Sequence, residues 1–325
     1  MKEINKKILI TGAAGFIGFS LAKDLLRKGY QIYGIDNFDN YYSTSLKKKR
    51  IKILNLNKNF YFKRIDIRNK NLLFKFLKNK DLNFIFHFAA QPGVRYSLIN
   101  PKKYFEVNVK GFVNLLETIK FKKIEKFFYA SSSSVYGDSN KFPVDEKQYL
   151  SPKNPYGISK KINEDIAQMY SIKENIPFIG LRFFTIYGEW GRPDMFIIKF
   201  FIKSSLKKVF ELNNAGKHYR DFTYIGDVLK IIKKLMKIKK TKDLNTIYNI
   251  CTSKPIYMKK LAEDLKKKIN FHKIININLN KADVLKTHGN NSKLLKSINK
   301  IKFTNIKKGI DHTFKWYNEY YKLFF

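Results

Sequence analysis

Hydrophobic positions along the chain alternate between short apolar runs and longer stretches with helical spacing. Residues 7–11 contain three consecutive aliphatic side chains and predict a buried strand, and the apolar spacing that follows predicts a helix that stops at Gly29. Further strands are expected at 31–35, 60–67, 84–90 and 126–131, and further helices at 69–79 and 101–121. Strands that alternate with helices form a parallel sheet covered on both faces. The pattern therefore predicts an α/β fold.

The loop between the first strand and the first helix is rich in glycine. Residues 11–18 read Thr-Gly-Ala-Ala-Gly-Phe-Ile-Gly. Glycine is needed where a backbone turns tightly or approaches a pyrophosphate, and the following helix offers free N–H groups to the phosphates. The second strand ends at Asp36, the usual place for a carboxylate that binds the adenosine ribose hydroxyls. This order predicts a Rossmann-type, doubly wound sheet that binds NAD, since a carboxylate there would repel the 2′-phosphate of NADP.

Tyr156 and Lys160 are the strongest candidates for chemistry. Residues four apart lie on one face of a helix, where an ammonium can stabilise a phenolate and bring its pKa down from about 10. The serine run at 131–134 follows a predicted strand, and ligands of such sheets lie at the carboxyl ends of the strands. A serine there can hydrogen-bond the oxygen on which the tyrosine acts. Together these groups can remove a proton from a carbinol while a nicotinamide takes the hydride.

Length and charge limit the classes of function. The 325 residues leave room for two unequal domains, which we expect at 1–184 for NAD binding and at 185–325 mainly for substrate binding, with segments that return to the first. The net charge of +39 comes from lysines scattered along the chain, so neither nucleic acid nor a membrane is expected as a partner. We interpret the basic clusters 47–50 and 266–268 as solvated faces. A positive excess would still attract a phosphorylated substrate.

Cysteine content and the apolar runs favour a cytoplasmic enzyme. Cys251 is the single cysteine, which excludes an internal disulfide framework and suits a reducing compartment. No signal peptide is visible, and no apolar run is long enough to cross a bilayer. No spacing of His, Cys and carboxylates predicts a metal site.

Several longer motifs connect these features. Residues 93–97 read Gly-Val-Arg-Tyr-Ser, residues 130–137 read Ala-Ser-Ser-Ser-Ser-Val-Tyr-Gly, and residues 181–195 contain Trp-Gly-Arg-Pro-Asp-Met. With the glycine loop and the Tyr-x-x-x-Lys pair, they resemble the extended short-chain dehydrogenase/reductase superfamily and, within it, the UDP-glucuronate 4-epimerases. The resemblance covers nearly the full length and is densest up to about residue 230.

The resemblance implies an NAD-dependent 4-epimerisation of UDP-glucuronate to UDP-galacturonate. Tyr156 would take the proton of the C4 hydroxyl while NAD takes the hydride. The 4-keto sugar would then rotate in the pocket, and the hydride would return to its opposite face. Ser133 and Ser134 stand where related dehydratases and decarboxylases usually carry an acid, which favours simple epimerisation. Alternatives are a 4-epimerase of UDP-glucose or UDP-N-acetylglucosamine, or a dehydratase or decarboxylase. A non-catalytic NAD- or RNA-binding protein is the alternative of a different class.

The resemblance also implies roles for single residues, a homodimer and a part in polysaccharide biosynthesis. Ser132, Tyr156 and Lys160 would be catalytic. Arg220 and Arg192 would bind the diphosphate or the sugar, and Thr185 the sugar carboxylate. The complete predicted sets are, for the cofactor, Gly12, Gly15, Phe16, Ile17, Gly18, Asp36, Asn37, Asp66, Ile67, Ala89, Ala90, Gln91, Tyr156 and Lys160, and, for the substrate, Arg95, Ser133, Ser134, Thr185, Arg192, Arg220 and Asp283.

Overall fold

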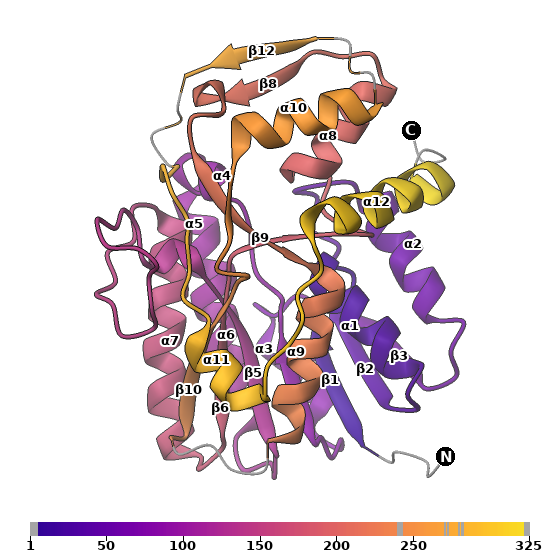
Figure 1. The fold of residues 1–325 in the computed structure, drawn as a ribbon. Coiled ribbons are helices and arrows are strands. Elements are labelled where there is room, and N and C mark those ends of the chain that lie inside the picture. Colours follow the sequence, from indigo (N-terminus) through magenta and orange to yellow (C-terminus); the bar gives the residue numbers. More distant parts are fainter. Residues whose placement is uncertain are drawn as a thin grey trace.

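A seven-stranded parallel sheet forms the centre of the computed structural model (Figure 1). The structure describes residues 6–238, 243–269, 271, 273–278, 280 and 283–321. The spatial order of the strands is β10-β6-β5-β4-β1-β2-β3, and every neighbouring pair is parallel. The predicted α/β fold with a parallel sheet is confirmed. The strands are β1 Lys7–Thr11, β2 Gln31–Asp36, β3 Phe60–Arg64, β4 Phe84–His87, β5 Lys126–Ser132, β6 Phe178–Phe183 and β10 Asn245–Ile250.

Helices cover both faces of this sheet. Because successive side chains of a strand point to opposite faces, Ile8 and Ile10 of β1 join the core beneath α1 (Phe16–Leu26) and α9 (Ile225–Lys237), whereas Leu9 joins the other core. That second face is covered by α3 (Lys70–Leu77), α6 (Gly111–Ile119) and α7 (Pro155–Lys173). The remaining helices on this part of the chain are α2 Thr44–Leu54, α4 Val94–Ile99 and α5 Pro101–Tyr104.

The ends of two predicted strands and the continuity of one predicted helix were wrong. β3 stops at Arg64 rather than 67, because the chain turns after Asp66, whose side chain accepts a hydrogen bond from the backbone N–H of Arg68, and β4 stops at His87 rather than 90. The helix predicted at 101–121 is divided into α5 and α6 by a π-helical segment, Phe105–Lys110. In that segment the side-chain amide of Asn108 pairs with the backbone N–H and C=O of Gln91. Local helical periodicity cannot reveal this long-range bond.

Smaller layers lie above the carboxyl ends of the strands (Figure 1). A three-stranded sheet combines β7 Thr185–Tyr187, β9 Tyr219–Tyr224 and β11 Pro255–Tyr257, and a two-stranded sheet pairs β8 Phe210–Asn213 with β12 Ile274–Ile277. The accompanying helices are α8 Phe196–Ser205, α10 Met258–Ile269, α11 Ser292–Ile298 and α12 Ile306–Trp316. After residue 184 the chain also returns to the main sheet as β10, and the division into two domains at that residue stays a prediction.

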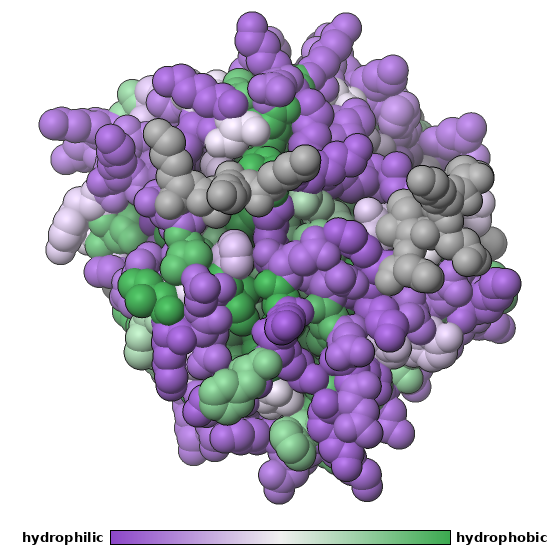
Figure 2. All heavy atoms as spheres, turned by 90° about the horizontal axis from the view of Figure 1, so that it is seen from below, coloured by the Kyte–Doolittle hydropathy of each residue, from purple (hydrophilic) through white to green (hydrophobic). Residues whose placement is uncertain are grey.

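One of the two basic clusters that were predicted to be exposed to solvent is partly buried in the structure. Figure 2 shows the face at the amino ends of the main strands, which is mostly hydrophilic with separate apolar patches. Lys266, Lys267 and Lys268 are exposed as predicted. The prediction was wrong for Lys47 and Arg50, which are only 6% and 0% exposed, since they turn inward from α2 towards the ligand edge of the sheet. In the described part of the chain, no helix is long and apolar enough to cross a membrane.

Candidate active site

A cavity of about 400 Å³ opens where the carboxyl ends of the main strands meet the smaller layers. Nearly all predicted site residues line it, although they come from distant parts of the chain. Asp66 and Arg95 do not, but neighbours or partners of both do. The predicted residues on its surface are Gly12, Gly15, Phe16, Ile17, Gly18, Asp36, Asn37, Ile67, Ala89, Ala90, Gln91, Ser132, Ser133, Ser134, Tyr156, Lys160, Thr185, Arg192, Arg220 and Asp283.

The glycine loop forms one end of the cavity. Gly12 has φ +71°, and a Cβ on it would lie 2.7 Å from the backbone N of Ala89. A Cβ on Gly18 would lie 2.2 Å from the carbonyl oxygen of Gly12. Gly15 precedes α1 and offers no side chain to cap the helix, so the first N–H groups of α1 remain available to a phosphate. The loop therefore packs tightly beside Ala89 and keeps at its end the N–H donors that a phosphate requires.

Asp36 lies beside this loop at the end of β2. Its carboxylate accepts hydrogen bonds from the backbone N–H groups of Ala14 (3.1 Å) and Phe38 (2.8 Å). Burial raises the pKa of Asp36, against these hydrogen bonds and the charge of Lys47. The carboxylate is thus held where the sequence predicts a contact with the adenosine ribose.

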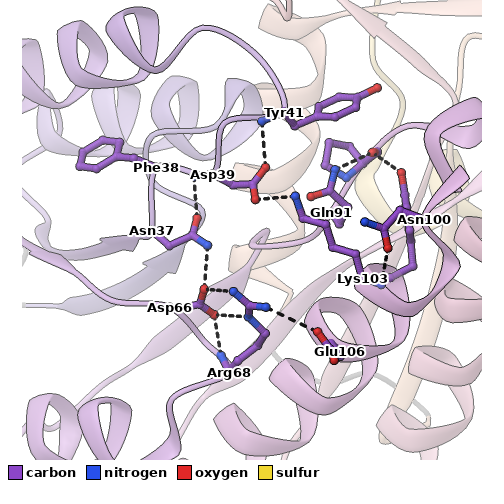
Figure 3. Close-up of polar contacts among 12 residues, drawn as sticks. Asn37, Phe38, Asp39, Tyr41, Asp66, Arg68, Gln91, Asn100, Lys103 and Glu106 are labelled. Atoms are coloured by element: carbon purple, nitrogen blue, oxygen red, sulfur yellow. Dashed lines mark hydrogen bonds and ion pairs between the residues drawn. The ribbon is translucent and has the colours of Figure 1, made fainter.

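Asp66 follows β3 on the adjacent loop, where its carboxylate is already engaged. Asn37 donates to Asp66 Oδ2 at 2.9 Å, and Arg68 donates to both carboxylate oxygens (Figure 3). Burial alone would raise the pKa of Asp66, but the hydrogen bonds from Arg68 and Asn37 lower it to about 2. Asp66 therefore orients Asn37 rather than lining the cavity itself, whereas its neighbour Ile67 does line it.

Ser132, Tyr156 and Lys160 all line the cavity and lie close to one another. The Nζ atom of Lys160 donates to the carbonyl oxygen of Ala130 at 2.9 Å and lies 6.0 Å from the centroid of the Tyr156 ring. Burial raises the pKa of Tyr156, while a hydrogen bond with Ser132 and the charge of Arg192 lower it. In the protein alone, the loss of hydration outweighs these two effects on the pKa of Tyr156, and the lowering of that pKa by Lys160 stays a prediction.

A buried ion pair lies next to these three residues. Arg182 of β6 donates to both oxygens of Glu164, at 2.8 and 2.7 Å, and both side chains are at most 5% exposed. Ser131 donates to the same carboxylate at 2.5 Å. Glu164 follows Lys160 by one helical turn, and its charge partly offsets the burial that lowers the pKa of Lys160 to about 8. No local signal predicts the pairing of Glu164 with Arg182, although the four-residue spacing of Glu164 from Lys160 is visible in the sequence.

The guanidinium groups at the substrate end have different partners. Arg192 uses Nε and Nη2 to bind Asp194, whose carboxylate also accepts a hydrogen bond from Tyr41. Arg95 forms a 2.6 Å ion pair with Asp283. Arg220 donates to the neighbouring backbone carbonyl of Tyr219 at 2.8 Å, and burial lowers its pKa. Among these three, Arg220 is the one that has no carboxylate within ion-pair distance in the part of the chain that the structure describes.

Other residues of the cavity were not predicted. Tyr41, Lys47, Asn154, Met195 and Thr287 line it. Asn154 could have been recognised, because an Asn before a Pro is a helix-start signal, and its side chain accepts a hydrogen bond from the N–H of Gly157 as the N-cap of α7. Lys47 and Thr287 carried no such local signal, since long-range folding brings them to the cavity.

Comparisons with known proteins agree with this geometry. The model of the NAD dependent epimerase/dehydratase family matches residues 8–251. Over 97% of its length, the chain is 36% identical to Protein CapI of Staphylococcus aureus, covering 99% of that protein. It is 35% identical, again over 97% of its length, to UDP-glucuronate 4-epimerase 2 of Arabidopsis thaliana, covering 76% of that chain. The crystal structure of UDP-glucuronic acid 4-epimerase from Bacillus cereus, in complex with UDP-glucuronic acid and NAD, has a TM-score of 0.90 and 31% identity, covering 96% of this chain and 99% of that one.

Proposed function

Because the chain belongs to the NAD-dependent epimerase/dehydratase family, we propose that it interconverts UDP-glucuronate and UDP-galacturonate by NAD-dependent 4-epimerisation. The observation that carries this proposal is the meeting of Ser132, Tyr156 and Lys160 in one cavity with the glycine loop and Arg192. The serines next to Ser132 leave no acid beside it for an elimination, which supports epimerisation over dehydration.

The residues at the glycine loop fit NAD. Gly12 and Gly18 let the loop pack against the backbone of Ala89 and of the loop itself more closely than a Cβ would permit, and the start of α1 can receive the pyrophosphate. Asp36 would bind the adenosine ribose, while Ala89, Ala90 and Gln91 would border the nicotinamide end. NAD, when bound, supplies the hydride acceptor and donor and, when oxidised, a positive charge that favours the Tyr156 phenolate.

The side chains of the protein supply the proton transfers. The Tyr156 phenolate would take the proton of the sugar C4 hydroxyl as the hydride leaves C4, and would return it when the hydride comes back to the opposite face of the 4-keto sugar. Ser132 would hold O4 through a hydrogen bond, in line with its place beside Tyr156, whose pKa it lowers. Lys160 would place its positive charge beside the phenolate.

The state of Lys160 predicts a pH dependence. Burial lowers the pKa of Lys160 to about 8, partly offset by Glu164, so the ammonium is protonated below that pH and neutral above it. We expect kcat/KM to fall as pH rises through about 8, since the charge that stabilises the phenolate is lost. The measurement is the pH profile of the purified enzyme beside Lys160→Arg, whose guanidinium does not deprotonate in this range. If kcat/KM of an active Lys160→Arg variant fell at the same alkaline pH as that of the unsubstituted enzyme, the fall could not be due to deprotonation of Lys160.

Substrate recognition would use the guanidinium groups. Arg220, which has no carboxylate at ion-pair distance among the described residues, is suited to the diphosphate. The ion pair with Asp194 leaves Nη1 of Arg192 for the sugar carboxylate, and Thr185 at the start of β7 lines the same cavity. Asp283, paired with Arg95, would bind the uridine ribose.

The test is turnover of UDP-glucuronate, UDP-glucose and UDP-N-acetylglucosamine, with products separated by chromatography. We expect UDP-galacturonate from UDP-glucuronate, and much slower turnover of the two neutral sugars. Arg192→Met should raise KM for UDP-glucuronate by about 10- to 100-fold, the value of one charge-assisted hydrogen bond, and leave KM for UDP-glucose nearly unchanged.

Two other results would change the proposal. Conversion of a neutral sugar but not of UDP-glucuronate would keep the reaction and overturn the substrate. Equal losses for both sugars in Arg192→Met would show that Arg192 shapes the cavity rather than reading the carboxylate.

We also propose that the protein is a homodimer. Met169 and Ile172 lie one turn apart on α7 and are 52% and 62% exposed, and Phe105 is 39% exposed. Apolar side chains on neighbouring helices of one face support burial against a second copy. A cytoplasmic location and a role in polysaccharide biosynthesis stay predictions.

A further inference from the structure

Acidic side chains gather at the adenosine end of the cavity although the chain as a whole is strongly basic. The chain has 65 Lys and Arg but only 26 Asp and Glu residues. Asp36 ends β2, and three further acids, Asp39, Asp66 and Glu106, lie on the loops after β2 and β3 and on the facing helical segment (Figure 3). A positive field attracts phosphates, so a chain of this charge would be expected to favour a dinucleotide with an extra 2′-phosphate. These carboxylates act against that preference locally.

Asp39 holds two ammonium groups. Its Oδ2 atom forms a 2.7 Å ion pair with Lys103 of α5, and its backbone carbonyl accepts a 2.5 Å hydrogen bond from buried Lys47. Its Oδ1 atom accepts a hydrogen bond from the backbone N–H of Tyr41 at 2.9 Å. Asp39 itself lines the cavity three residues after Asp36. The loop therefore directs the Lys103 ammonium towards a carboxylate instead of leaving it free for a ligand.

Arg68 is engaged in a similar way. Its guanidinium donates to both oxygens of Asp66, at 3.0 and 2.8 Å, and lies 3.6 Å from Glu106. Lys103 and Arg68, two cations next to the loops after β2 and β3, are therefore paired with carboxylates of the protein, and neither of them lines the cavity itself. Lys103 is the more easily released of the two, because it has one carboxylate partner and Arg68 has two.

We propose that Asp39 is a determinant of selectivity for NAD over NADP, because it keeps Lys103 from serving as a ligand of the 2′-phosphate. This inference rests on the proposed function for the orientation of NAD, with the adenosine ribose at Asp36. Removal of the Asp39 charge both frees the Lys103 ammonium and removes a repulsion near the 2′ position. Asp36 remains and still disfavours the phosphate, so the change in selectivity is partial.

The experiment compares the dissociation constants of NAD and NADP for nucleotide-free, full-length protein by isothermal titration calorimetry at low salt. Asp39→Asn keeps an amide oxygen for the N–H of Tyr41 while removing the charge. We expect NADP to bind about tenfold more tightly to Asp39→Asn than to the unsubstituted protein, because the released Lys103 ammonium adds one charged hydrogen-bond donor. The dissociation constant of NAD should change by less than about twofold. The gain should shrink at high salt.

The matched control is the double variant Asp39→Asn/Lys103→Met, in which the gain in NADP affinity should disappear. The inference is overturned if NADP affinity stays unchanged in Asp39→Asn, or if the gain persists in the double variant. Equal weakening of NAD and NADP binding in Asp39→Asn would also overturn the inference, because the ion pair between Asp39 and Lys103 would then only hold the loop against α5. Failure of the unsubstituted protein to bind NAD would instead overturn the proposed function, and this inference with it.

Discussion

We expect the Tyr156→Phe variant to lose about 10³-fold in kcat with UDP-glucuronate, the usual contribution of a general acid–base group. The substitution removes one oxygen, the atom that would exchange a proton with the sugar C4 hydroxyl. The ring keeps its edge contact with Tyr104, with centroids 6.1 Å apart, so the fold should be retained. Steady-state kinetics give kcat and KM, and calorimetry gives the dissociation constant of NAD, which should change little.

Tyr41→Phe is the matched control, because Tyr41 lines the same cavity and its hydroxyl lies 3.3 Å from Asp194 Oδ2. Loss of that ordinary hydrogen bond should cost about tenfold or less. If Tyr156→Phe retained as much activity as Tyr41→Phe, another group would have to carry the proton. A parallel loss of NAD binding in Tyr156→Phe would indicate a structural defect rather than a missing acid–base group.

The second large effect concerns the buried ion pair. We expect Glu164→Ala to lower the free energy of unfolding by about 3–5 kcal/mol, because it leaves the Arg182 guanidinium buried without a carboxylate. Arg182 is only 3% exposed in its side chain, and Ser131 would lose its acceptor as well. Urea denaturation at neutral pH gives the change as a shift in midpoint at constant slope.

Two further variants test the cause of this loss. Glu164→Leu/Arg182→Met removes both charges and should recover much of the stability, since well-packed apolar pairs often replace buried ion pairs at little cost. Asp138→Ala breaks an exposed pair with Lys153 and should cost about 1 kcal/mol or less. If Glu164→Ala lowered the free energy of unfolding by no more than Asp138→Ala does, water would have to reach the Arg182 guanidinium.

Much of the site could be predicted because its signals are local in sequence. The glycine loop, Asp36 and the Tyr156/Lys160 spacing each occupy one short segment, and strand ends of a parallel sheet necessarily meet at one edge. Apolar periodicity likewise determined the order of strands and helices. The ends of β3 and β4 were less predictable, since the chain leaves the sheet there to border the cavity.

Only the tertiary structure decided which charges meet. Asp39 and Lys103 are 64 residues apart, and Arg95 and Asp283 are 188 apart, so no local pattern indicates either pair. The same holds for Lys47 and Arg50, which look like part of a solvated basic face in the sequence but are buried. The sequence by itself determined the elements and the chemistry of their ends, because both depend on neighbouring residues. The protonation and partners of the site residues depend on burial and on contacts between distant segments, which exist only once the chain has folded.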